Sequence, residues 1–256
     1  MRVVVVHRLD KQKEGLEIAE EVSKKLTVVG VFTLEEFTPI DSDLVIAVGG
    51  DGTVLRIAKC SEKPIVGFNA GRVGFLTSYH LRNADVFLKD IDRNNLTTEK
   101  LWMLKAVTTN DSHDIVNDVV VHRSMTEGMI ELDVTLDSCS ALHFFADGLV
   151  FSTPTGSTAY NLALGGAIVS PCCDVFQMIP IAPYFFQNRS VIAPLTRRAL
   201  VESPKSFEIF VDGAHVGRDN HLEVMKSSRY FTLLRPKNYD FFNVLKSKVG
   251  YGRGLR

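Results

Sequence analysis

The sequence carries almost no net charge, and it has no long hydrophobic run. Its formal net charge is -1 over 256 residues, whereas proteins that bind nucleic acids or anionic membranes usually show a clear basic excess. No run approaches the ~20 apolar residues of a membrane-spanning helix. Met1 and Arg2 precede only four valines, too few for a signal-peptide core. We therefore expect a cytoplasmic protein with no nucleic-acid or membrane partner. The basic tail, residues 246–256, is the one local exception, and we interpret it as a solvated or loosely docked chain end.

Cysteine is scarce and badly spaced for metal binding. The chain has four cysteines, none in a C-x-x-C pair, and an adjacent pair is a poor zinc-ligand spacing. We interpret them as small apolar residues of a reducing compartment: Cys60, Cys139, Cys172 and Cys173. No protein-held metal is predicted from these residues.

Hydrophobic residues follow two different periods along the chain. In the first hundred residues, short apolar runs alternate with amphipathic segments, which is typical of a parallel sheet covered by helices. Beyond about residue 97, several segments alternate apolar and polar residues, as antiparallel strands with one wet face do. We expect parallel strands at 3–6, 28–32, 44–48 and 64–68, helices at 13–26, 53–59 and 84–91, and antiparallel strands within 100–108, 129–137 and 207–211.

The first candidate site is the sequence AVGGDGTVLRIA, residues 47–58. Its motif is neither G-x-G-x-x-G nor G-x-x-x-x-G-K-[ST]. Gly49 and Gly50 would let a phosphate or ribose approach the backbone, and Gly52 would permit a positive φ. Thr53 is a suitable N-cap for a helix whose first N–H groups would face a phosphate.

Asp51 is the one carboxylate of this loop. It would project at the carboxyl end of a parallel strand, where open α/β sheets bind ligands. Taken alone, these residues are equally compatible with an ordinary Asp-Gly turn.

Two further segments are rich in glycine and small polar residues. GFNAGRVGFLTS, residues 67–78, follows a predicted strand, and its glycines bracket Asn69 and Phe75. We expect it to line the same crevice as the first loop. DGLVFSTPTGSTAYNLALGGAIVSP, residues 147–171, offers many hydroxyl and backbone donors. Its Tyr160 could stack on a flat ring or hold a phosphate. The alternative is an irregular loop with Ser and Thr turns.

An amide and a carboxylate stand side by side at Asn117 and Asp118. Such a pair suits a sugar diol or an exocyclic amine, although Asn-Asp is also a common turn sequence.

These segments occur in an order that resembles the NAD kinase family. The resemblance also includes NRSVIAP at 188–194 and VDGA at 211–214, and it runs from residue 43 to about residue 215. Diacylglycerol and sphingosine kinases share GGDGT, and phosphofructokinases contain a similar run. The run STPTGSTAY is much more specific to NAD kinases.

The resemblance implies transfer of the terminal phosphoryl group of ATP, or of polyphosphate, to the 2′-hydroxyl of the adenosine ribose of NAD. It implies that Asp51 accepts the hydroxyl proton. It also implies a set of nucleotide-binding residues: Gly49, Gly50, Gly52, Thr53, Arg56, Asn69, Phe75, Asn117, Asp118, Asp147, Thr155, Ser157, Thr158, Ala159, Tyr160, Ala182 and Asp212. Of these, Arg56 is expected either to meet a phosphate or to be an ordinary surface arginine.

The family's fold implies an α/β domain with a parallel sheet and an antiparallel, β-sandwich-like second domain, with the site between them. The chain end is expected to return to the first domain, which gives boundaries of 1–97 completed by about 232–256, and 98–231. Because family members usually form dimers or tetramers, the resemblance also implies one of these assemblies. Mg²⁺ would be held mostly by the ATP phosphates and by water, so no protein ligand is named.

Four positions depart from the family's usual residues. Asp118 stands where Glu is commoner, Tyr184 and Phe185 replace His-Ser, and Ala214 replaces a frequent Gln. These departures affect the finer contacts and the preference between NAD and NADH. Two other functions are compatible with the loop: a dinucleotide sensor without catalysis, and a lipid kinase that shares GGDGT.

Overall fold

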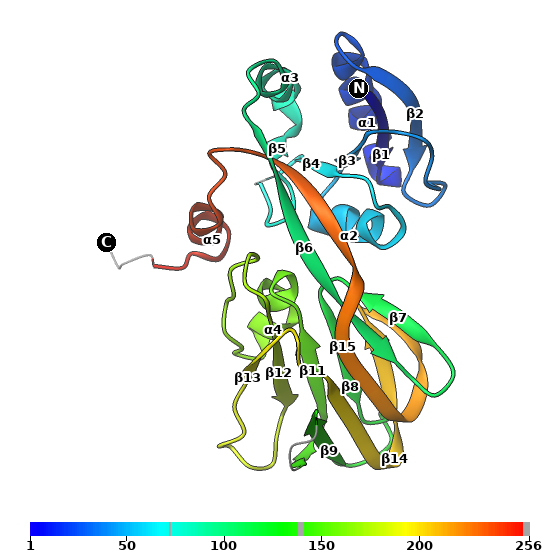
Figure 1. The fold of residues 1–256 in the computed structure, drawn as a ribbon, viewed down its shortest axis with the longest axis vertical. Helices are drawn as coiled ribbons and strands as arrows, with labels where there is room; N and C mark the ends of the chain where they lie inside the picture. Colours follow the sequence, from blue (N-terminus) through cyan, green and yellow to red (C-terminus); the bar gives the residue numbers. More distant parts are fainter. Residues whose placement is uncertain (72, 138–140, 253–256) are drawn as a thin grey trace. The chain divides into compact units, whose positions relative to one another are not determined.

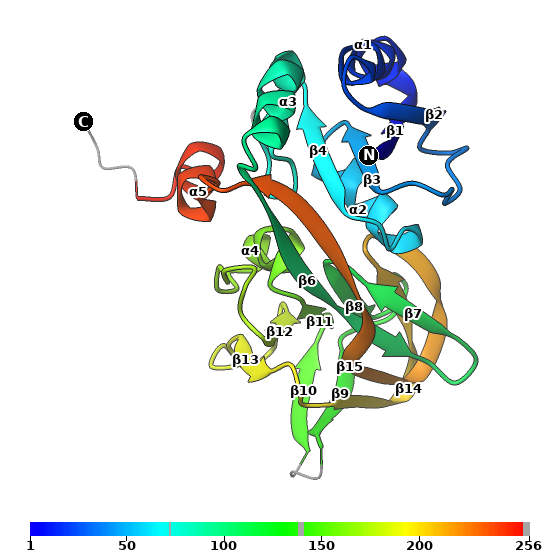
Figure 2. The same ribbon diagram turned by 45° about the horizontal axis from the view of Figure 1, so that its top comes forward.

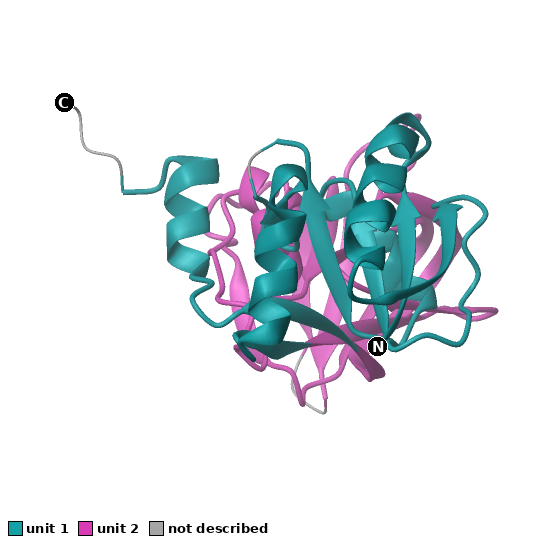
Figure 3. Cartoon of the chain, turned by 90° about the horizontal axis from the view of Figure 1, so that it is seen from above, with its two compact units in different colours: residues 1–100, 231–256 teal, residues 101–230 magenta. Residues whose placement is uncertain are grey.

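The chain divides into two compact units. The computed structural model describes residues 1–71, 73–137 and 141–252. Unit 1 comprises residues 1–100 and 231–256, and unit 2 comprises residues 101–230 (Figure 3). The chain passes from unit 1 to unit 2 within β6 (Leu96–Val107) and returns within β15 (Ala214–Pro236) (Figure 1).

Unit 1 is built on a parallel sheet. Its strand order is β4-β3-β1-β2, and Leu233 of β15 pairs with Ile65 of β4. The strands are β1 (Arg2–His7), β2 (Thr27–Thr33), β3 (Leu44–Val48), β4 (Ile65–Asn69) and the short β5 (Tyr79–His80). The helices are α1 (Gln12–Ser23), α2 (Asp51–Cys60), α3 (Ala84–Asp92) and α5 (Phe241–Val249), with 3-10 turns at Leu9–Lys11 and Leu81–Asn83.

Both faces of this sheet are covered, which explains the unbroken valine run of β1. Val3 and Val5 belong to one apolar cluster with Ile18 of α1 and Phe87 of α3. On the opposite face, Val54 of α2 lies directly against Gly67 of β4. The helices α1, α2 and α3 can be followed in Figure 2. The expected doubly covered parallel sheet is confirmed.

Unit 2 consists mainly of antiparallel strands. The order is β13-β12-β11-β8-β14-β15, β9 pairs with β14 and β10, and β6 pairs with β7 and β15. The remaining bounds are β7 (Ser112–Ile115), β8 (Asp118–His122), β9 (Ile130–Leu136), β10 (Leu142–Ala146), β11 (Gly148–Ser152), β12 (Val175–Ile181), β13 (Val191–Pro194) and β14 (Ala199–Val211), with a 3-10 turn at Thr155–Thr158 and α4 (Tyr160–Ala163). The core includes Ile130, Leu132 and Val134, the apolar positions of the predicted alternation.

Several local predictions are wrong. Helix α2 begins at Asp51 with Gly50 as its N-cap, so Thr53 is inside the first turn and is not the cap. Gly52 is therefore helical and is not among the residues with positive φ. The described cysteines, Cys60, Cys172 and Cys173, are exposed, and Cys139 lies outside the described residues.

Candidate functional site

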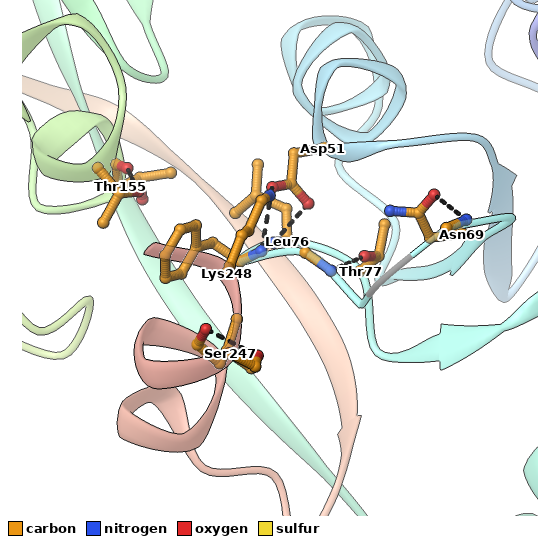
Figure 4. A network of polar contacts seen from close by, with 12 residues as sticks. Asp51, Asn69, Leu76, Thr77, Thr155, Ser247 and Lys248 are labelled. Carbon is orange, nitrogen blue, oxygen red and sulfur yellow. Dashed lines mark hydrogen bonds and ion pairs between the residues drawn. The ribbon is translucent and has the colours of Figure 1, made fainter. Parts of the chain in front are cut away.

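Asp51 is held in place by the second glycine loop. Its Oδ2 accepts a hydrogen bond from the Phe75 N–H and its Oδ1 accepts one from the Leu76 N–H, each at 3.0 Å (Figure 4). The loop also closes on itself, because the Gly74 N–H donates to the Thr77 hydroxyl at 2.6 Å. A Cβ atom at Gly74 would collide with the Asp51 carboxylate, so glycine at this position is needed to keep the carboxylate in this place. The two glycine loops therefore meet within unit 1, at the start of α2.

The carbonyl of Phe75 accepts hydrogen bonds from two residues near the end of the chain. The Phe75 carbonyl accepts from Arg235 Nη2 at 2.6 Å and from the Tyr239 hydroxyl at 3.3 Å. Arg235 is almost fully buried, pairs with Glu99, and has Tyr239 stacked on its guanidinium at 3.8 Å. Burial raises the pKa of Tyr239 to about 12, so its hydroxyl remains a donor. Two donors, the buried Arg235 and the partly buried Tyr239, thus fix the peptide that positions Asp51.

Helix α5 brings a lysine to Asp51. Lys248 Nζ lies 2.5 Å from Asp51 Oδ2 and 5.0 Å from the centre of the Phe75 ring. The ring of Phe241, the first residue of α5, packs on Phe75 at 5.7 Å between centroids. Of the two interpretations of residues 246–256, a solvated or a loosely docked chain end, Lys248 fits the docked one, while residues 253–256 lie outside the described part.

A cavity of about 590 Å³ opens beside the start of α2. It is lined by Gly50, Gly52 and Thr53 of the glycine loop and by two arginine–acid pairs, Arg8 with Asp10 and Arg56 with Glu35. Arg56 is thus half-exposed, and its Nη1 lies 3.2 Å from Glu35 Oε1. Because the first N–H groups of a helix lack intrahelical partners, this cavity can accept an anion.

The remaining predicted residues of unit 1 have structural contacts. Gly49 lies over the Thr53 hydroxyl, which is buried and has no hydrogen-bond partner among the described residues. Asn69 ends β4, and its Oδ1 accepts from the Gly71 N–H at 3.2 Å (Figure 4).

In unit 2, Asp212 organises the Asn117-Asp118 pair. Asp212 and Gly213 form the two-residue turn between β14 and β15, with φ values of 48° and 80°, the left-handed conformation that such hairpins require. The Asp212 carboxylate accepts from the N–H groups of Val116, Asn117 and Asp118 at 3.0, 2.6 and 3.1 Å. Asp212 is a positioning residue for this segment.

The Ser- and Thr-rich segment supports the same pair from the other side. The Thr153 hydroxyl donates to the Val116 carbonyl at 2.6 Å, and the Thr153 N–H donates to the Asn117 carbonyl at 2.9 Å. Gly156 lies so close to the Asn117 carbonyl that a Cβ there would collide with it.

Most hydroxyls of this segment point inward. Ser157 is fully buried, and its Oγ donates to backbone carbonyls and accepts from the Val169 N–H. Thr155 is buried, and the Thr158 hydroxyl is 3.4 Å from the Thr155 carbonyl. The many donors predicted from composition are thus used largely within the loop.

A second cavity, of about 480 Å³, lies in unit 2. It brings together five of the predicted residues: Asn117, Asp118, Ala159, Tyr160 and Asp212. Its other lining residues were not predicted as binding residues: Val120, His122, Met125, Phe210 and Gly213. A lining that combines polar groups with apolar side chains and aromatic rings suits a nucleoside.

Five predicted residues of unit 2 are not among those that line this cavity: Asp147, Thr155, Ser157, Thr158 and Ala182. Asp147 pairs with Arg123, whose Nε donates to Asp147 Oδ1 at 2.6 Å. Ala182 follows β12 and has a positive φ of 43°, which is uncommon for a residue with a side chain.

The described residues contain no group of three or more His, Cys, Asp or Glu side chains able to hold a metal ion. In the same part of the chain, no helix has the length and apolar character needed to cross a membrane.

Residues 2–95 match the family of the ATP-NAD kinase N-terminal domain, and residues 116–235 match that of the ATP-NAD kinase C-terminal domain.

Similar proteins agree with these family matches. The NAD kinase of Thermotoga petrophila is 42% identical over 257 residues, which is 100% of both chains. The crystal structure of an NAD kinase from Archaeoglobus fulgidus in complex with ATP superposes with a TM-score of 0.81 at 28% identity, covering 98% of this chain and 99% of that one. The yeast NADH kinase complexed with NADH has the same fold, with a TM-score of 0.85 at 20% identity, covering 100% of this chain and 89% of that one. The chain therefore belongs to the NAD kinase family.

Proposed function

We propose that this NAD kinase transfers the terminal phosphoryl group of ATP to the 2′-hydroxyl of the adenosine ribose of NAD, with Asp51 as the base. The observation that carries this assignment is the position of the Asp51 carboxylate. It begins α2 within the glycine loop and is fixed by the Phe75 and Leu76 N–H groups. A base that is held rigidly by backbone donors needs no reorganisation when the hydroxyl arrives.

The reaction forms one bond and breaks one bond. The 2′-oxygen attacks the γ-phosphorus of ATP, the bond from that phosphorus to the β,γ-bridging oxygen breaks, and ADP leaves. The hydroxyl proton passes to Asp51 Oδ1. Among the described residues Oδ1 accepts from Leu76 alone, and a carboxylate oxygen can accept two hydrogen bonds.

The triphosphate is assigned to the cavity at the start of α2. Gly50 and Gly52 present backbone without side chains there, the helix N-terminus favours an anion, and Arg56 is within the lining. Mg²⁺ fits this chemistry as an ion held by phosphate oxygens and water, since the loop offers one carboxylate that already has three hydrogen-bond donors. The ion would neutralise charge on the phosphates when bound.

The cavity of unit 2 is assigned to NAD. Asn117 and Asp118 supply an amide and a carboxylate that are fixed by Asp212, which suits the hydroxyls of a ribose. Tyr160 and Phe210 offer ring faces for a flat base. We further infer a cytoplasmic enzyme that forms a dimer or tetramer, which light scattering of the purified protein can measure.

A coupled assay tests this function. Protein, NAD, ATP and Mg²⁺ are incubated, and NADP is detected with an NADP-specific dehydrogenase. We expect Asp51→Asn to lower kcat by about 10²-fold or more with NAD binding retained in calorimetry. The matched control is Asp85→Asn, which removes an exposed carboxylate paired with Lys89 in the same unit.

Undiminished turnover in Asp51→Asn would contradict the base assignment. If wild type forms no NADP with ATP, polyphosphate replaces ATP as the donor. NAD binding without NADP from either donor would identify a dinucleotide sensor. Thermal unfolding of each variant checks that the fold is kept.

A further inference from the structure

The proposed chemistry leaves the ion pair between Asp51 and Lys248 without a role. Lys248 Nζ donates to Asp51 Oδ2 at 2.5 Å, and both side chains are partly exposed, at 37% and 25%. The two residues are 197 positions apart in the sequence. A lysine near the end of the chain therefore contacts the proposed base, and this lysine remains accessible to a ligand.

Phosphoryl transfer needs a positive charge close to the group in transit. In loops of the G-x-x-x-x-G-K-[ST] type, a lysine of the loop itself supplies that charge. The loop at residues 47–58 contains no lysine, and its one arginine, Arg56, faces Glu35. The described residues do contain a cation at Asp51, and it is Lys248.

Distance permits Lys248 to reach the phosphoryl group. A base accepts a proton over about 3 Å, and the attacking oxygen lies about 3–3.5 Å from the atom that it attacks. A hydroxyl that is bound to Asp51 therefore places the γ-phosphorus within about 6.5 Å of the carboxylate. A lysine side chain whose Nζ already touches that carboxylate covers the remaining gap by rotating its flexible stem.

We propose that Lys248 is a further catalytic residue, which leaves Asp51 for the γ-phosphoryl oxygens when the substrates bind. The proposal rests on the proposed function. In the substrate-free protein the ammonium group neutralises Asp51. With ATP present, the phosphate offers it more negative charge than a single carboxylate does, and Asp51 Oδ2 loses this donor as the hydroxyl approaches. No bond to Lys248 forms or breaks, and its proton count is unchanged.

The surroundings of Lys248 are built to hold it near this point. Val244 and Leu245 of α5 are buried, and Phe241 packs on Phe75. The helix begins with the Asp240 carboxylate accepting from the Phe242 N–H and ends at Gly250 with φ 77°. Lys248 lies in the last turn, where a helix favours a cation. Because partly exposed ion pairs contribute little net stability, the ammonium can exchange partners readily.

Lys248→Met tests the proposal in the NADP-coupled assay. We expect kcat to fall by about 10²-fold, as after loss of one transition-state donor, while KM for NAD changes little. The matched control is Lys246→Met, which removes the same charge from an exposed position of the same helix and should keep the wild-type kcat. Thermal unfolding of both variants reports on the fold.

Chemical rescue separates a catalytic role from a structural one. Lys248→Ala should regain kcat with added propylammonium, in proportion to its concentration, and propanol at the same concentration should have no effect. A lysine that serves only to dock α5 would give no such rescue.

The outcomes distinguish this proposal from the function on which it rests. NADP from wild type establishes the function, and the ratio of Lys248→Met to wild type then decides the role of Lys248. An unchanged kcat overturns the proposal, and a raised kcat also overturns it, because it would identify Lys248 as an inhibitory contact. Absence of NADP from wild type with either donor removes the function and the proposal together.

Discussion

Each unit uses an aspartate that binds consecutive backbone N–H groups, and the aspartate of unit 1 also pairs with an accessible lysine. Asp212 of unit 2 accepts from three N–H groups of residues 116–118. Asp51 of unit 1 accepts from two N–H groups and also from a lysine that is itself accessible. The same contact therefore fixes a loop in both units, and in unit 1 it leaves the carboxylate with a cation that can exchange. This difference underlies our proposal that Asp212 positions its segment whereas Asp51 takes part in the reaction.

The largest expected effect comes from displacing Asp51 without changing it. In Gly74→Ala, the new Cβ would collide with the Asp51 carboxylate and force it from the Phe75 and Leu76 N–H groups. We expect kcat to fall by about 10²-fold, since a displacement of about 1 Å has this effect on a reacting group. Gly71→Ala is the matched control, because the nearest atom to its Cβ is Asn69 Oδ1 at 4.0 Å. Equal kcat for the two variants would show that the position of Asp51 is unimportant.

A smaller and different effect is expected for Asp212→Asn. Asparagine tolerates the positive φ of this turn, but its amide would turn an N–H₂ donor toward the Val116 N–H or lose the bonds to Asn117 and Asp118. We expect the free energy of unfolding to fall by about 1–3 kcal/mol and KM for NAD to rise, with kcat less affected than in Gly74→Ala. Steady-state kinetics and denaturant unfolding measure both. A loss confined to kcat would remove the contrast between the two aspartates.

The smallest effect is expected for Tyr239→Phe, which removes one of two donors to the Phe75 carbonyl. Near neutral pH the loss of stability should be about 1 kcal/mol. Burial raises the Tyr239 pKa to about 12 from its ordinary value of 10.0, so the folded state retains the proton over a range in which the unfolded state loses it. Wild-type stability should therefore fall as pH rises from about 10 to about 12.

The phenylalanine variant should lose stability less steeply over that pH range. Denaturant unfolding of wild type and variant across the range compares the two slopes. Identical slopes would show that Tyr239 does not titrate differently in the two states.

Local patterns predicted the fold class well. The valine run of β1 indicates a strand that is buried on both faces, and the alternation at 130–136 indicates a strand that is buried on one face. Both segments were confirmed as strands. The glycine loop could be recognised because its residues are consecutive. By contrast, Lys248 reaches Asp51 from 197 residues away, and no local period encodes such a contact.

The amino-acid composition of a segment does not predict the direction in which its side chains point. The segment around residues 155–158 was predicted to offer hydroxyls to a ligand, yet the Ser157 hydroxyl is fully engaged with backbone inside the loop. A sequence specifies that a hydroxyl is present, but the path of the surrounding backbone decides where it points. Thr53 failed as an N-cap for the same reason, since Gly50 already fills that place.

The return of the chain in β15 has a consequence for the order of synthesis. The Asp51 loop emerges early from the ribosome, but Arg235 and Tyr239, which hold the Phe75 carbonyl, follow only after all of unit 2 has been made. At about 5–20 residues per second this delay is on the order of ten seconds. The centre of the proposed chemistry is thus completed last, so an interrupted nascent chain carries the glycine loop without the contacts that would make it competent.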